Sequence, residues 1–141
     1  MPPRIRNILA VTAGVITGSL VNMAIVSIGT DLIPPPEWLD LTDMKAVQEN
    51  SKKLAPVHFI APWLAHAMGT LVAAFIAAKL AASHRMKFAL GMGVWFLAGG
   101  IVMVLLVGGP MWFTAADLGA AYLPMAFLGG VLAGALKSPP V

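Results

Sequence analysis

The stretch PVHFIAPWLAHAMGTLVAAFIAAKLAASHR, from Pro56 to Arg85, decides the fold class of this chain. It is long enough to cross a membrane, because about 20 apolar residues rising about 1.5 Å each span the hydrocarbon core. Small residues recur at every fourth position within it, namely Ala61, Ala65, Gly69, Ala73, Ala77 and Ala81. Such a ridge without side-chain bulk predicts that another helix packs closely against this one.

His66 lies near the middle of that predicted span, where ionisable side chains are functional candidates. We expect His66 to be buried, neutral and hydrogen-bonded to Asn22 or to another group of the first span, because no carboxylate is expected at that depth. Three interpretations stay open for it: a core histidine, a proton-linked or substrate-contacting group, or a haem or chlorin ligand. The candidate polar or ligand-contacting residues are His66, Asn22, His58 and Thr70.

The composition predicts an integral membrane protein, since 59% of its 141 residues are hydrophobic and only 11% are charged. In soluble domains about a quarter of the residues are charged. Apolar runs of spanning length cover residues 5–29, 56–82, 88–107 and 117–136. We therefore expect an all-α, four-helix transmembrane bundle that forms a single domain from residue 1 to residue 141.

Helix-packing positions are predicted on three of these spans. Besides the ridge on the second span, small residues at four-residue spacing mark the first span at Gly14 and Gly18 and the fourth span at Gly130 and Gly134. The packing residues we expect are Gly14, Gly18, Ala65, Gly69, Ala73, Gly130 and Gly134. Pro62 and Pro124 are expected to kink their helices, and Asp117 is expected to cap the fourth helix.

The polar connection between the first two spans predicts a short amphipathic helix. After Trp38, the residues Leu41, Met44, Val47, Ser51 and Leu54 recur at intervals of three or four. Asp40 or Thr42 can serve as its N-cap. We expect this helix to lie on the membrane surface or to cap the bundle, on the outer side.

The distribution of charge predicts the orientation of the chain. The cations Arg4, Arg6, Lys79, Arg85, Lys87 and Lys137 fall on one side, and all six carboxylates fall on the other. The positive-inside rule then puts both termini in the cytoplasm, with the chain in the cell inner membrane. We expect Trp38, Trp63, Trp112 and Tyr122 at or near the outer interface.

Several function classes are disfavoured by what the sequence contains. The absence of cysteine removes disulfides, thiolate metal sites and thiol catalysis. His58 and His66 are eight residues apart on one helix, about 12 Å in height, and so cannot chelate one metal ion. The cations flank apolar segments, so we expect no nucleic-acid binding, and no arrangement of residues predicts an enzyme.

In size and number of spans the chain resembles the small multidrug resistance transporters, four-helix proteins that work as dimers. That family uses a glutamate in its first helix for proton-coupled export, whereas residues 13–18 of this chain contain no acid. The order of VNMAIVSIG, LIPPP, HFIAPWLAHAMGTL and DLGAAYLPMAFLGG also resembles an uncharacterised family of small four-helix bacterial membrane proteins. This second resemblance supplies no activity and no site.

Two functions are compatible with these observations. The ridges on three helices favour a non-catalytic accessory or scaffold subunit that packs against other transmembrane helices, in a larger complex or a homo-oligomer. The polar residues around His66 favour an oligomeric, proton-linked transporter or channel with a cavity in its outer half. No cofactor is expected beyond the haem or chlorin alternative at His66.

Overall fold

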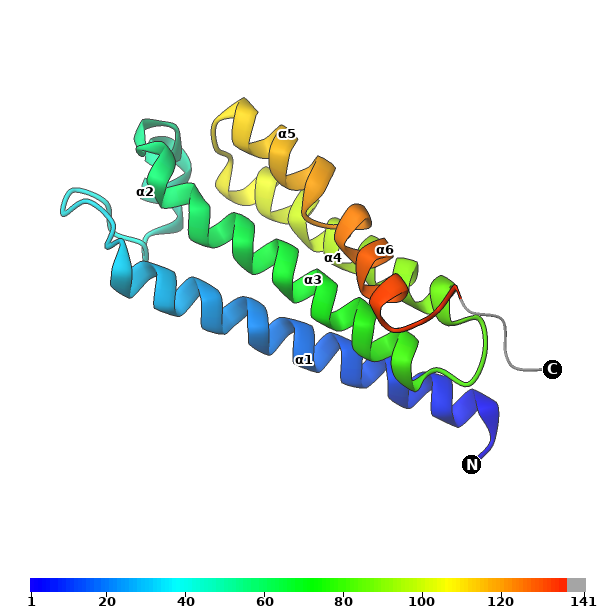
Figure 1. The fold of residues 1–141 in the computed structure, drawn as a ribbon. Helices are drawn as coiled ribbons and strands as arrows, with labels where there is room; N and C mark the ends of the chain where they lie inside the picture. Colours follow the sequence, from blue (N-terminus) through cyan, green and yellow to red (C-terminus); the bar gives the residue numbers. More distant parts are fainter. Residues whose placement is uncertain (137–141) are drawn as a thin grey trace.

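A computed structural model describes residues 1–136 of the chain (Figure 1). The described residues are helical and contain no β-strand. Four helical stretches among them are long and apolar enough to cross a membrane, namely Pro3–Leu32, Pro56–Leu80, Arg85–Val107 and Met111–Leu132. The predicted all-α class and the number of apolar spans are therefore confirmed.

Helices α1 (Pro3–Leu32) and α3 (Ile60–Leu80) lie side by side along most of their length (Figure 1). Their backbones approach closely, because a Cβ atom on Gly18 would lie 2.6 Å from the carbonyl oxygen of Gly69 and from Cβ of Ala73. A Cβ atom on Gly14 would likewise lie 2.7 Å from the carbonyl oxygen of Ala73. Small residues on both helices therefore make this contact possible.

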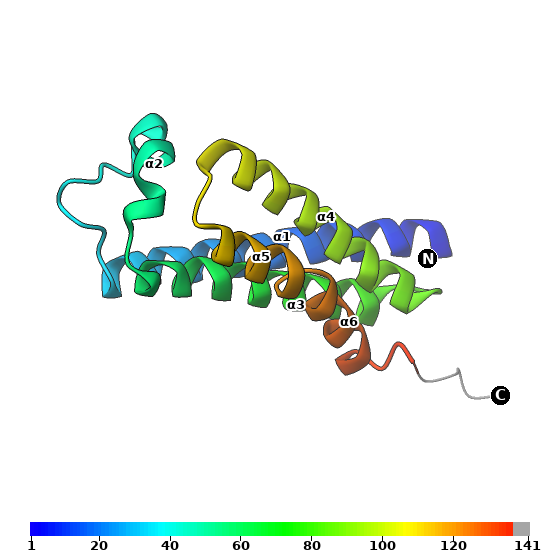
Figure 2. The same cartoon turned by 90° about the horizontal axis from the view of Figure 1, so that it is seen from above.

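Helices α4 (Arg85–Val107) and α6 (Leu123–Leu132) also pack against α3 and against each other (Figures 1 and 2). A Cβ atom on Gly130 would lie 2.9 Å from Cβ of Ala89 in α4. The core between the helices consists largely of alanine: Ala73, Ala74, Ala77, Ala78, Ala89, Met92, Ala126 and Ala133. Close approach of the helices fills this core where large side chains would fill the core of a soluble protein.

Two prolines interrupt the spanning helices. A 3₁₀ turn, η2 (Pro56–Phe59), precedes α3, because Pro62 cannot donate a backbone hydrogen bond to the carbonyl of His58. The last span is divided into α5 (Met111–Ala120) and α6, because Pro124 likewise cannot donate to Ala120.

The start of the fourth span differs from the prediction. Residues 111–116 were expected to form a connection, but α5 begins at Met111 directly after Pro110, whose fixed φ suits a position just before a helix. Asp117 consequently lies six residues after the start of α5 and does not cap it. The acid that was expected at the start of the helix thus belongs to the interior of the spanning segment.

The end of the fourth span also differs from the prediction, and Gly134 is not a packing residue. Helix α6 ends at Leu132, and Gly134 adopts a positive φ of 78°, with nothing within 4 Å of the place that a Cβ atom would take. The Gly134 N–H donates to the Val131 carbonyl at 2.8 Å, and the Ala135 N–H donates to the Gly130 carbonyl at 2.9 Å. Gly134 therefore terminates the helix in a Schellman motif.

The connection after α1 contains helix α2 (Met44–Asn50), followed by a 3₁₀ turn, η1 (Ser51–Lys53). Its N-cap is Asp43, and not Asp40 or Thr42 as predicted. Oδ1 of Asp43 accepts hydrogen bonds from the backbone of Lys45 and Ala46 at 2.9 and 3.2 Å. We call this end of the molecule, where α1 ends and α3 and α5 begin, the α2 end.

Two arginine side chains bind backbone carbonyl groups at the opposite end of the molecule, which we call the arginine end. Nε of Arg6 donates to the carbonyl of Leu80 at 2.7 Å, and Nε of Arg85 donates to the carbonyl of Ala78 at the same distance. Cations at helix C-termini satisfy carbonyl groups that have no partner within the helix. Lys137, which was counted among the cations of this end, lies outside the described residues.

Candidate functional site

The candidate site is built on a hydrogen bond between two ionisable side chains, one from α3 and one from α5. Nδ1 of His66 lies 2.8 Å from Oδ1 of Asp117. Both helices begin at the α2 end, and the two residues lie six positions after Ile60 and Met111, respectively. A rise of about 1.5 Å per residue therefore brings them to the same depth, about 9 Å from the helix starts.

Tyr122 completes this cluster from the break between α5 and α6. Its hydroxyl donates to Oδ2 of Asp117 at 3.1 Å, and its ring stacks on His66 with centroids 5.6 Å apart. When Asp117 is ionised, His66 donates from Nδ1 to one oxygen and Tyr122 donates to the other. Nε2 of His66 is then the ring nitrogen that remains free.

Burial separates the roles of the two ionisable residues. The side chain of Asp117 is 3% exposed, whereas that of His66 is 22% exposed. Among the described residues, no lysine or arginine forms a salt bridge with Asp117. An isolated buried charge is costly. When Asp117 is ionised, a proton on His66 gives the pair a net charge of zero.

Gly100 of α4 makes room for Tyr122. A Cβ atom at this position would collide with the hydroxyl oxygen and ring of Tyr122. Tyr122 is buried in the protein core, and its predicted depth near the outer interface stays a prediction. Because Gly100 has no side chain, the Tyr122 hydroxyl has room to reach Asp117.

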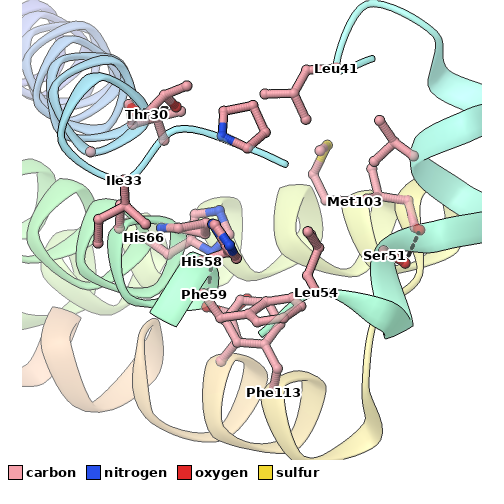
Figure 3. A pocket seen from close by; sticks show the side chains of 18 of the residues that line it. Thr30, Ile33, Leu41, Ser51, Leu54, His58, Phe59, His66, Met103 and Phe113 are labelled. Atoms are coloured by element: carbon pink, nitrogen blue, oxygen red, sulfur yellow. Dashed lines mark hydrogen bonds and ion pairs between the residues drawn. The ribbon is translucent and has the colours of Figure 1, made fainter. Parts of the chain in front are cut away.

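A cavity of about 430 Å³ opens beside the cluster at the α2 end (Figure 3). Figure 3 shows Thr30, Ile33, His58, His66 and Met103 around it. Its polar lining residues are Asn22, Thr30, Ser51, His58, His66 and Asp117, and the remaining lining is apolar. Cavities of this kind, largely apolar with a few polar groups, are typical of small-molecule sites.

The structure brings three of the four predicted polar residues to this cavity. Asn22, His58 and His66 line it, whereas Thr70 is buried away from it, and no partner for the Thr70 hydroxyl is present among the described residues. The predicted bond between His66 and Asn22 is wrong, because among the described residues His66 bonds to Asp117 through Nδ1 and not to Asn22. The expectation that no carboxylate lies at that depth is wrong for the same reason.

The hydroxyl groups of the cavity are bonded to the backbone. Ser51 donates to the carbonyl of Val107 at 3.3 Å, and Thr30 donates to the carbonyl of Val26 at 2.9 Å. Neither of these two hydroxyls donates to His66. The side chains of Asn22 and His58, by contrast, form no hydrogen bond with another described residue.

Aromatic side chains form the wall of the cavity next to α5. The rings of Phe59 and Phe113 lie 4.7 Å apart, and both residues line the cavity. Both also line an almost wholly apolar groove of about 650 Å³ on the outside, between η2 and α5. Trp63 fixes α3 to α5 by donating from Nε1 to the carbonyl of Ala116 at 3.3 Å.

Metal binding has no candidate site in residues 1–136, where no three His, Cys, Asp or Glu side chains lie close enough to share an ion.

Asp117 and Tyr122 are the site residues that the sequence analysis missed. Asp117 is the one acid within the span Met111–Leu132, and an acid inside a spanning segment is a signal of function.

The chain matches no protein-family model, and no curated protein or solved structure is significantly similar to it. The geometry of the cavity and of the cluster therefore carries the functional argument.

Proposed function

We propose that this protein binds a small amphipathic molecule in the cavity beside His66, and that binding is linked to a proton on His66. In this proposal the helices form a four-helix transmembrane bundle in the cell inner membrane. Both termini are cytoplasmic, and α2 lies on the outer surface. The protein then acts as a small proton-linked transporter or as the binding component of one.

One observation supports the proposal above all others: His66 is held by a buried carboxylate and faces a cavity between membrane-spanning helices. The hydrogen bond to Asp117 orients the ring and fixes which of its nitrogens is free. Ionisable residues inside a membrane protein commonly mark substrate or proton pathways. A bound molecule that contacts Nε2 would therefore alter the affinity of His66 for a proton, and the reverse holds by linkage.

The proposal is for a non-catalytic protein. Catalysis by a His–Asp pair requires a group that His66 activates, and both cavity hydroxyls donate to backbone carbonyls. The cavity lining contains one carboxylate, so two-carboxylate acid–base chemistry has no second partner among the described residues.

The accessory-subunit hypothesis has less support. It was motivated by small-residue ridges that other chains could use, but Gly14 and Gly18 pack on α3, and Gly130 packs on α4. At Gly91 and Gly99 of α4, by contrast, a Cβ atom would have no neighbour within 4 Å. These two positions are the remaining argument for a contact with another membrane helix.

Purification in mild detergent, followed by a binding assay, tests the proposal. The fluorescent probe 1-aminoanthracene should bind with a signal that depends on pH and is lost in His66→Gln. The matched control is His84→Gln, which alters the histidine at the arginine end and should leave binding unchanged. Recovery of the chain in a stoichiometric larger complex, with no probe binding, would instead favour the accessory subunit.

A further inference from the structure

The charge of the cavity indicates what kind of molecule it accepts. Asp117 is its one carboxylate, His58 and His66 are its other ionisable lining groups, and no lysine or arginine of the described chain lines it. With both histidines neutral, the lining therefore carries one negative charge next to apolar walls. Such a charge attracts a cation more strongly than it would in water.

The hydrogen-bonding groups of the cavity are acceptors in the same state. Nε2 of His66 is free when Nδ1 donates to Asp117. The amide oxygen of Asn22 and a ring nitrogen of His58 can also accept, and neither side chain has a protein partner among the described residues. The side chains of these three residues come from α1, η2 and α3 and border the same cavity.

We infer that the ligand is a protonated primary amine with an apolar body, and that its ammonium group donates to Nε2 of His66. A primary ammonium carries one positive charge, which matches the charge of Asp117, and it carries N–H donors for Nε2 of His66. Phe59 and Phe113 line the same cavity and can contact the apolar body of the ligand. This inference rests on the proposed function and names its ligand class.

The same geometry makes a proton compete with the amine. A proton on Nε2 of His66 neutralises Asp117 and converts Nε2 from an acceptor into a donor. The groups that face His66 are Asp117 from α5, Tyr122 from the α5–α6 break, and the cavity residues Asn22 and His58. Protonation of His58 would add a second positive charge to the cavity and would also weaken the binding of the amine.

Three probes with one tail test the inference: octylamine, octanol and octyltrimethylammonium. Each is titrated into the full chain in nanodiscs, with empty nanodiscs to subtract partitioning into lipid. We expect octylamine to bind about tenfold more tightly than octanol at about pH 8, a difference of about 1.4 kcal/mol. We expect this preference to fall as the pH is lowered, because a proton on Nε2 of His66 would replace the acceptor with a donor.

Histidine-selective ¹⁵N labelling shows whether the amine reaches the inferred atom. The chain contains three histidines, so His66 can be assigned by comparison with His66→Gln. Octylamine should shift the Nε2 resonance of His66, while the resonances of His84 at the arginine end stay in place. Asp117→Asn should make octylamine and octanol bind equally.

Each contrary result has a distinct meaning. Octanol binding as tightly as octylamine at pH 8, or an unmoved His66 resonance, would overturn the amine and leave the proposed function standing. Octyltrimethylammonium binding as tightly as octylamine would overturn the hydrogen bond to Nε2, because this cation has no N–H group. Failure of all three probes and of 1-aminoanthracene to bind would overturn the proposed function as well.

Discussion

Nδ1 of His66 and Oδ1 of Asp117 lie 2.8 Å apart although 51 residues separate them in the chain. The contact joins α3 to α5, the short helix that begins after Gly108, Gly109 and Pro110 and ends before the break at Tyr122. The contact therefore links His66, which faces the cavity, to α5, which forms one of the cavity walls.

We predict that the pair is energetically coupled and asymmetric. His66→Leu should cost more stability than Asp117→Leu. His66→Leu leaves the buried carboxylate of Asp117 without the imidazole, whereas Asp117→Leu leaves a neutral imidazole. The coupling energy in the double-mutant cycle should lie between about 0.6 kcal/mol, the average for hydrogen bonds between membrane helices, and about 1.7 kcal/mol, the maximum. Reversible unfolding of the purified variants in mixed micelles measures it. Equal costs for the two single variants would contradict an ionised Asp117.

Gly100→Ala should displace Tyr122 and destabilise the protein by about 1–3 kcal/mol, the usual cost of overpacking a core. The physical reason is the collision of the new Cβ atom with the Tyr122 hydroxyl and ring. Gly99→Ala is the matched control, since nothing lies within 4 Å of a Cβ atom there. It should be neutral or stabilising by up to about 1 kcal/mol, because alanine favours a helix over glycine. The same unfolding assay compares the two variants.

Gly18→Ala should loosen the contact between α1 and α3. Its Cβ atom would lie 2.6 Å from the carbonyl oxygen of Gly69, a backbone atom that cannot rotate away. We expect a loss of about 1–3 kcal/mol, whereas Gly91→Ala on the open face of α4 should cause no loss. Cysteine cross-linking between α1 and α3 gives a second readout, which should fall in Gly18→Ala alone.

We predict that the stability of the connection after α1 depends on pH through Asp40. Hydrogen bonds from the side chain and backbone of Thr42, at 2.7 and 2.8 Å, lower the pKa of Asp40 below its usual value. A lowered pKa in the folded state means that the turn is stabilised above the ordinary aspartate pKa and loses this contribution as the pH falls through the lowered value. Thr42→Ala should raise the pKa of Asp40, and Thr42→Ser should keep it low. Carboxyl ¹³C NMR during an acid titration measures both, and an Asp40 pKa unaffected by Thr42→Ala would contradict the assignment.

The orientation can be tested directly because the chain has no native cysteine. A cysteine at Gln48 in α2 should react with an impermeant maleimide in intact cells, and a cysteine at Ser83 at the arginine end should react only after the cells are permeabilised. Both positions are exposed, so burial does not explain a difference between them. The opposite labelling pattern would reverse the topology.

Part of the site could be predicted from the sequence. His66 stands out as an ionisable residue inside an apolar run, and Asn22 and His58, which were selected with it, line the same cavity. Asp117 meets the same criterion once the last span is taken to begin at Met111. It was expected to be a helix cap because the last span was predicted to begin at residue 117. An error of a few residues in one helix boundary therefore concealed the partner of His66.

The sequence by itself determined that the chain is helical, that four stretches can cross a membrane, and where prolines and glycines interrupt them. Hydropathy and backbone restriction are local properties, summed over neighbouring residues, so the sequence is sufficient to determine them. Only the tertiary structure decided that His66 meets Asp117 and not Asn22, that Tyr122 packs over Gly100, and that a cavity lies beside them. These contacts depend on the rotation and relative depth of separate helices, which are set by the packing of small residues across their interfaces.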